Sequence, residues 1–106
     1  MSGITILYTV FPDRESALRV VRQCVRDGLT ACANILSPCN SVYEWEGDIV
    51  ETEEVPVIFK TTAARVDQLI EELSIMHPYD VPAILSWPIV RAPHSFAKWV
   101  NEQVHR

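Results

Sequence analysis

Apolar and polar residues alternate along several stretches of the chain, and a period of two predicts β-strands. Residues 4–11 alternate clearly, with β-branched and aromatic side chains recurring, and 29–36 returns to the same character. Residues 40–62 form the longest such stretch, with Glu46-Gly47 at a position suited to a tight turn. This stretch predicts one long β-hairpin. Ser37-Pro38 is expected to break or kink the strand that leads into it.

Helical spacing appears over residues 14–27, between Asp13, a plausible N-cap, and Gly28, a typical residue just past a helix end. The expected buried stripe of this helix is Ala17, Leu18, Val21, Cys24 and Val25. A second helix is expected to be capped by Thr61-Thr62 and terminated by Pro78. Its expected buried face is Val66, Leu69, Ile70, Leu73 and Met76.

The last third of the chain predicts one more strand and a short final helix. Residues 81–90 read as extended, and Pro82 and Pro88 within them suit an edge strand. Pro93 opens the C-terminal helix. The whole order is β-α-β-β-α-β plus this helix, which predicts an α+β, ferredoxin-like fold. Residues 1–106 are expected to form a single domain, with two helices covering one face of a four-stranded antiparallel sheet.

The predicted hairpin is long for so small a domain. A strand advances about 3.3 Å per residue, so residues 30–46, if mostly extended, span on the order of 50 Å. A compact domain of this size has a radius of gyration near 13 Å and is roughly 35 Å across. Part of the hairpin must therefore bend back or project. A projecting arm with aromatic residues needs a cover, and another copy of the same chain provides one.

Charge and composition exclude several classes of protein. The net charge of −5 and pI of about 5.0 disfavour nucleic acid and anionic membranes as partners. No apolar run approaches the ~20 residues of a membrane helix, and no secretory signal is visible, so we expect a soluble, cytoplasmic protein. The chain has an odd number of cysteines and no CxxC pair, so we expect packed thiols rather than disulfides at Cys24, Cys32 and Cys39.

The densest polar cluster is Met76-His77-Pro78-Tyr79-Asp80, at the predicted end of the second helix. His77 can cap the helix and interact with its dipole, ligate a metal or carry a proton. The structural role is favoured, with metal binding next. Met76 can ligate Cu(I) through its thioether, although a methionine at this spacing is more often core.

The hairpin carries two further candidate features. Its acids suit hard cations, but charges on exposed strands also prevent edge-to-edge aggregation, and the second interpretation is favoured. Tyr43, Trp45 and Tyr79 can stack on a small ligand or fill a subunit contact. Lys60 can neutralise an acid or hold an anionic ligand. A catalytic role for Glu54 with His77 ranks lowest, because no nucleophile or cofactor motif accompanies them, and we expect no enzyme.

Several segments together resemble one family, and they occur in its order along nearly the whole chain. They are Ala31-Cys32-Ala33-Asn34-Ile35, Ser41-Val42-Tyr43-Glu44-Trp45-Glu46-Gly47, Glu54 with Lys60-Thr61, His77-Pro78-Tyr79-Asp80-Val81-Pro82, and Trp99. The chain resembles CutA, the divalent-cation tolerance family. The resemblance implies a homotrimer in which strands of the long hairpin extend sheets across subunit boundaries.

The resemblance also implies a role in tolerance to divalent metals, copper in particular, without an established reaction. A trimer similar to that of PII signalling proteins implies the alternative of a sensor for a small anionic metabolite. The implied cleft between subunits collects Tyr43, Trp45, Glu54, Lys60, His77 and Tyr79. This chain departs from some relatives at Tyr8, Pro56, Met76, Asp80 and Ala83. The lost candidate ligands predict at most weak copper binding.

Overall fold

The computed structural model describes residues 2–104. Within this range the chain alternates strands and helices in the predicted order, with one predicted strand divided in two. The elements are β1 (Ile4–Phe11), α1 (Arg14–Arg26), β2 (Cys32–Ile35), β3 (Cys39–Trp45), β4 (Asp48–Thr62), α2 (Val66–Met76), β5 (Ile84–Pro88) and α3 (His94–Gln103). The α+β, ferredoxin-like prediction is confirmed.

The fifteen-residue strand β4 organises the sheet. It pairs antiparallel with β3 at one end, from Trp45 opposite Asp48 to Cys39 opposite Glu54, and with β2 further along. β2 and β3 are therefore the two halves of one strand, and the predicted break at Ser37-Pro38 separates them. The main strand order is β2-β4-β1-β5, which places the proline-containing β5 at an edge as expected.

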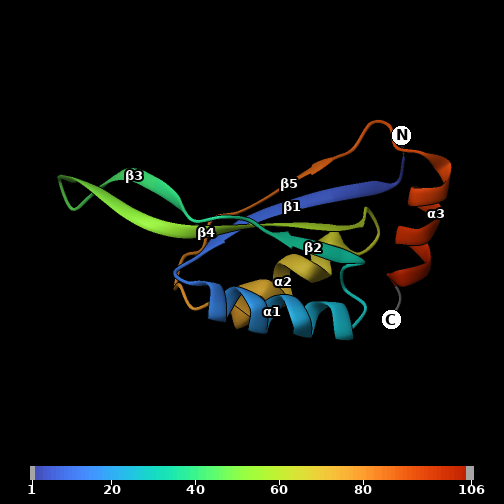
Figure 1. Ribbon diagram of the computed structural model, residues 1–106, viewed down its shortest axis with the longest axis horizontal. Helices are drawn as coiled ribbons and strands as arrows, with labels where there is room; N and C mark the ends of the chain where they lie inside the picture. Colours follow the sequence, from blue (N-terminus) through green and yellow to red (C-terminus); the bar gives the residue numbers. More distant parts are fainter. Residues whose placement is uncertain (1, 105–106) are drawn as a thin grey trace.

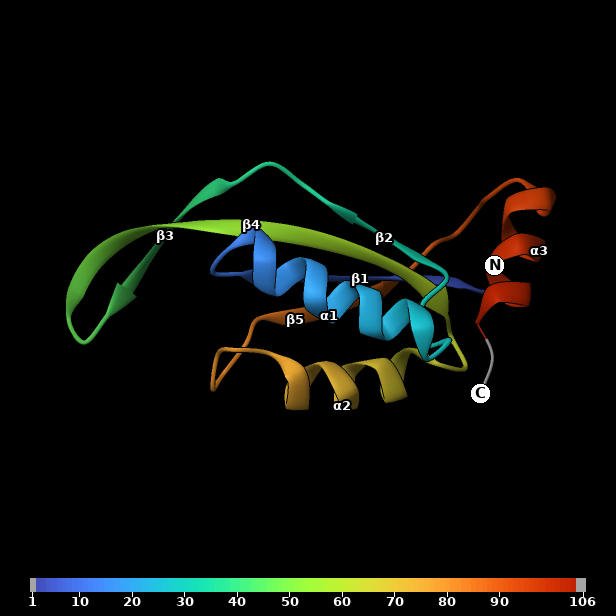
Figure 2. The ribbon, with the colours of Figure 1, turned by 60° about the horizontal axis from the view of Figure 1, so that its bottom comes forward.

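The two faces of this sheet differ in cover. Helices α1 and α2 lie side by side against one face, and no helix lies across the middle of the other (Figures 1 and 2). Alternation along β1 sends Leu7, Thr9 and Phe11 into the helix-covered core, where each is almost wholly buried. The opposite face, here called the open face, carries Ile6, Tyr8, Ile58, Leu85 and Trp87, which are half-buried or exposed.

Local chemistry fixes the limits of α1. The Asp13 carboxylate accepts a hydrogen bond from the Ser16 backbone N–H at 2.7 Å, which confirms it as the N-cap and lowers its pKa. Gly28, with φ of 71°, turns the chain out of the helix. The predicted stripe needs one correction. Val20 is buried and Val25 is 44% exposed, because the buried stripe runs through Ala17, Val20, Val21 and Cys24 at helical spacing.

Two other boundary predictions are wrong. Thr61 and Thr62 do not cap α2, because both remain in β4, where the Thr61 hydroxyl donates to the Leu29 carbonyl at 2.7 Å. Arg65 occupies the N-cap position without a side-chain cap bond. The extended segment expected over 81–90 is a strand only from Ile84 to Pro88, the part that pairs with β1.

The hairpin of β3 and β4 projects from the body, as its length predicts. The molecule measures 46 × 25 × 23 Å, with a radius of gyration of 14.5 Å against the roughly 13 Å of a compact domain. Figure 1 shows the projecting arm at the end opposite α3. Glu46 and Gly47 have φ of 50° and 88°, the paired positive values of a tight hairpin turn.

Candidate functional site

The site begins where α2 ends. His77 is the C-cap residue, and its backbone N–H donates to the Leu73 carbonyl at 2.8 Å. Its side chain is buried, at 7% exposure. Nε2 lies 2.9 Å from the Val10 carbonyl oxygen and 3.1 Å from the Thr9 hydroxyl oxygen. Nδ1 accepts from the Tyr79 backbone N–H at 3.2 Å. Because Nδ1 accepts a hydrogen bond, the ring proton of the neutral imidazole lies on Nε2. The Nε2–H then donates a hydrogen bond to the Val10 carbonyl oxygen.

Both ring nitrogens of His77 are therefore in use within the chain. The ring also stacks on Phe11, with centroids 4.5 Å apart. Burial lowers the pKa of His77, against the opposing effects of the Val10 carbonyl and Glu54. These contacts favour the structural role over metal binding, since a metal would have to displace one of these hydrogen bonds. Metal binding by His77 stays a prediction. Met76 packs against the core cluster, the more common role expected for it.

Tyr79 connects this histidine to the hairpin. Its hydroxyl donates to Oε2 of Glu54 at 2.7 Å, and its ring lies 5.2 Å from that of His77. Burial and the neighbouring Glu54 carboxylate raise the pKa of Tyr79. The sequence His77-Pro78-Tyr79 thus joins the end of α2, β1 and β4. It holds the following loop beside the base of the projecting arm.

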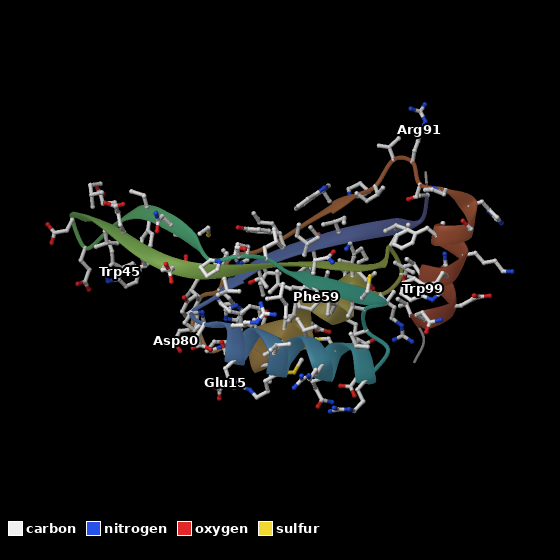
Figure 3. The ribbon with its side chains drawn as sticks, viewed as in Figure 1. Glu15, Trp45, Phe59, Asp80, Arg91 and Trp99 are labelled. Carbon is white, nitrogen blue, oxygen red and sulfur yellow. The ribbon has the colours of Figure 1, made fainter. Side chains whose placement is uncertain are left out.

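A groove of about 720 Å³ lies between this loop and the hairpin. Figure 3 shows Trp45 on the projecting arm and Asp80 near the end of the helical layer from which the arm departs. The groove is lined by Val10, Tyr43, Trp45, Val50, Thr52, Glu54, Tyr79, Asp80, Val81 and Ala83. Four of the six residues expected to meet in a cleft are therefore brought together within one chain.

Strand register explains why the hairpin residues converge. Tyr43 lies opposite Val50, Trp45 opposite Asp48, and Glu54 opposite Cys39. Directly opposed residues share a face of the ribbon, so these side chains point the same way. Sequence reasoning did not assign the other lining residues to the cleft, among them Val10, Val50 and Thr52. Alternation along β4 would have assigned Val50 and Thr52 to the face of Glu54, but Val10 needed the pairing of β1 with β4.

Lys60 does not join this groove. It lies six residues beyond Glu54 along β4, about 20 Å away at strand spacing, and its ammonium donates to the side-chain oxygen of Asn34. Tyr8 lies on the open face, where burial, followed by Cys39 and Glu54, raises its pKa. The lining of this groove therefore includes no Lys, Arg or His that could pair with an anion.

The acids of the hairpin do not form a metal shell. Glu44, Glu51 and Glu53 occupy the face opposite the one that carries Asp48 and Glu54, because register alternates them. Among residues 2–104, no group of three or more His, Cys, Asp or Glu side chains is placed to hold a metal ion. Within residues 2–104, one chain thus shows no closed site built from these ligand types.

The three cysteines are free thiols. Cys24 lies on the buried face of α1, in the core, and burial raises its pKa to about 12. Cys32 and Cys39 are partly buried and lie on different strands. The expectation of unpaired thiols is confirmed for all three, and burial makes the Cys24 thiol reluctant to ionise.

Comparison with known proteins gives a consistent result. A sequence model of the family described as CutA1 divalent ion tolerance protein matches residues 5–103. The divalent-cation tolerance protein CutA of Pyrococcus horikoshii is 41% identical over 101 residues, covering 95% of this chain and 98% of that protein.

Solved structures agree with the family match. The crystal structure of divalent ion tolerance protein CutA1 from Ehrlichia chaffeensis superposes with a TM-score of 0.95 at 38% identity, covering 100% of this chain and 99% of that one. A CutA from Archaeoglobus fulgidus, described as periplasmic, gives 0.92 at 32% identity, covering 96% and 99%. In the described part of this chain no helix is long and apolar enough to cross a membrane. On the family match and these likenesses, the chain belongs to the CutA1 divalent ion tolerance protein family.

Proposed function

We propose that this protein acts in tolerance to divalent cations, copper among them, as a non-catalytic cytoplasmic homotrimer. Family membership supports the cation role. The proposal of an assembly rests on the open face of the sheet. A domain of this size stabilises itself only modestly, so an apolar sheet face without cover is better stabilised by association.

The open face is largely apolar across adjacent strands, with Lys60 opposite Ile6 as its charged member. Ile6 and Tyr8 of β1 lie beside Ile58 of β4 and Leu85 of β5, and Trp87 continues the patch. Leu85 is 60% exposed and Trp87 45% exposed. Helices α1 and α2 cover the other face, and α3 packs against the open face only at its end, around Ile4. A closed ring of copies would bury this patch without leaving an unpaired surface, which favours a cyclic oligomer over an open chain.

The contacts of the polar residues support a binding role rather than catalysis. A general base needs a free ring nitrogen or carboxylate beside a reacting group. The His77 ring is held by Val10, Thr9 and Tyr79, and Glu54 is bonded to Tyr79. These hydrogen bonds fix the groove wall and leave His77 little freedom to exchange protons with a substrate.

Direct copper binding by one chain is expected to be weak. The donors are scattered over two faces of the hairpin, and the imidazole of His77 is already bonded on both sides. Titration with Cu(II) and Cu(I) should therefore show no tight site in a protein kept dilute enough to dissociate. A tight one-to-one site in that form would contradict this part of the proposal.

The alternative remains a PII-like sensor of a small anionic metabolite. It requires Lys60 of one copy to approach the groove of another, because within a chain the two lie apart. Thermal-shift measurements against a panel of anionic metabolites test it. Substituting Lys60→Gln should abolish any stabilisation found, and a Lys60-independent response would count against this alternative.

Light scattering and growth assays test the leading proposal together. The purified protein should have the mass of three chains of 12.0 kDa each. Cells lacking the protein should regain tolerance to excess copper when given the wild type, and less so when given Trp87→Asp, which places a charge on the open face. A stable monomer in light scattering would overturn the proposed trimer. Full rescue by a monomeric variant would show that copper tolerance does not depend on the trimer.

A further inference from the structure

The outward face of α1 carries a row of arginines on a chain that is acidic overall. Four of the nine lysines and arginines of this chain lie in α1, whereas Glu15 is the one acid of this helix. Arg19, Arg22 and Arg26 follow Glu15 at steps of four, three and four residues, which is the spacing of one helix face. All four side chains are exposed. The three arginines are here called the arginine row.

The proposed trimer leaves the arginine row exposed. Figure 3 shows Glu15, on the same helix face, pointing away from the sheet. The trimer would bury the open face, and α1 lies on the other side of the sheet (Figure 1). The groove beside the projecting arm is lined by β1, the hairpin and the loop after α2, and not by α1. The row therefore lies apart from the surfaces that another copy is expected to cover.

The fold of one chain does not account for the arginine row. A cation in the last turn of a helix interacts favourably with the helix dipole, which explains Arg26, but this effect does not extend back to Arg19 and Arg22. Arginines three and four residues apart repel each other on a helix surface, so the row lowers the stability of α1. Glu15 lies four residues before Arg19 and offsets that charge alone. An acidic partner would supply the missing counter-charges.

The surface around the row combines charge with an apolar edge. A shallow depression of about 330 Å³ is lined only by residues of α1, and it includes the row together with Leu18. Val25, seven residues after Leu18, continues the same apolar edge and is 44% exposed. At the far end of the row, the Gln23 side chain accepts from Arg26 at 3.2 Å and donates to the Asp27 carboxylate at 2.9 Å. These bonds hold the last arginine of the row in place.

The row is short, which limits what can bind to it. At 1.5 Å per residue, Arg19 to Arg26 spans about 10 Å along the helix. Glu15 precedes the row and Asp27 follows it, so a long polyanion would meet carboxylates at both ends. The net charge of −5 further opposes nucleic acid. A short anionic segment fits this surface better.

Carboxylates match the chemistry of the row, because a guanidinium group pairs with a carboxylate through two parallel hydrogen bonds. We propose that the arginine row docks an acidic peptide segment of another protein, with carboxylates paired to Arg19 and Arg22 and an aliphatic side chain beside Leu18. This interaction surface lies outside the proposed function, which concerns metal tolerance and assembly.

Fluorescence anisotropy with the whole protein tests the proposal. A fluorescein-labelled peptide of Glu-Ala-Glu-Leu repeats should bind at about 0.05 M salt and at least about tenfold more weakly at about 0.5 M, because salt screens exposed charges. The same peptide with Gln in place of Glu should not bind, and an oligothymidylate of equal charge should bind more weakly than the acidic peptide. If the acidic peptide fails to bind, or the oligothymidylate binds at least as tightly, the proposal is overturned.

A double variant locates the surface. Arg19→Gln with Arg22→Gln removes two exposed charges, keeps good helix formers and should weaken binding of the acidic peptide about tenfold. Arg91→Gln with Lys98→Gln makes the same charge change away from α1, as Figure 3 shows for Arg91, and should leave binding within about twofold. Equal weakening in both double variants would assign the effect to net charge and overturn the proposal.

A second copy of this chain is the competing acidic partner, through the carboxylates of its projecting arm. Light scattering at the same low salt distinguishes it. The proposal expects the same mass for the wild type and for Arg19→Gln with Arg22→Gln. A lower mass in this double variant would show that the arginine row binds another copy, and the proposal of a different protein as partner would fail.

Discussion

The two faces of the sheet are built from adjacent residues of the same strands, but one is buried under helices and the other remains partly exposed. Leu7 and Phe59 are wholly buried under the helices, whereas their neighbours Ile6 and Ile58 lie on the open face and remain partly exposed. Both faces are largely apolar. The difference teaches that apolar composition identifies what must be covered, while the position of the helices decides which face the chain covers itself.

The largest effect should come from truncating the helix-covered face. Leu7→Ala removes a fully buried side chain and is expected to lower the free energy of unfolding by about 2–5 kcal/mol, through lost burial and a residual cavity. Ile6→Ala, one residue away, should cost clearly less in a dilute, dissociated sample. Urea denaturation at low protein concentration measures both. Equal losses would erase the distinction between the faces.

Charge on the open face should affect association more than the folding of one chain. For the wild type we expect a melting temperature that falls on dilution, since a trimer is stabilised by mass action. Leu85→Asp should remove that concentration dependence. Ile75→Asp, on α2 and 78% exposed, is the matched control and should retain it. Scanning calorimetry over a hundredfold range of protein concentration distinguishes the two variants. If the melting temperature of Leu85→Asp still falls on dilution, the contact between copies does not involve the open face at Leu85.

His77, on the helix-covered side of the sheet, should make the free energy of unfolding depend on pH. Its pKa is lowered in the folded protein, so below the ordinary value of about 6.5 the unfolded chain binds more protons than the folded one. The free energy of unfolding should therefore decrease as pH falls from about 6.5 towards the folded pKa. His77→Gln should be less stable at neutral pH but flatter across this window. Identical slopes in both proteins would show that His77 is not the titrating group.

The smallest effect should come from the link between the body and the arm. Tyr79→Phe removes the hydroxyl that donates to Glu54 and keeps the ring, so we expect a loss of about 1 kcal/mol at this partly exposed site. The titration of tyrosine absorbance should lose its most basic component, because burial and the neighbouring Glu54 raise the pKa of Tyr79. A most basic component that survives in Tyr79→Phe would show that Tyr79 is not the tyrosine with the raised pKa.

Sequence periodicity determined much of this molecule. The strand at 4–11, the cap at Asp13, the turn at Glu46-Gly47 and the projecting hairpin follow from local rules, because short-range sterics and hydrogen bonds act between near neighbours. The same rules failed for Thr61-Thr62, where pairing in β4 overrode a good capping sequence.

Only the tertiary structure decided the groove and the state of His77. The contacts of His77 with Thr9 and Val10 bridge more than sixty residues of sequence, and those contacts engage its nitrogens. Likewise Tyr79 meets Glu54 across 25 residues, whereas Lys60, on the same strand as Glu54, lies apart. Periodicity tells which side of a strand a residue occupies, but the distance between two side chains depends on how the strands and helices pack.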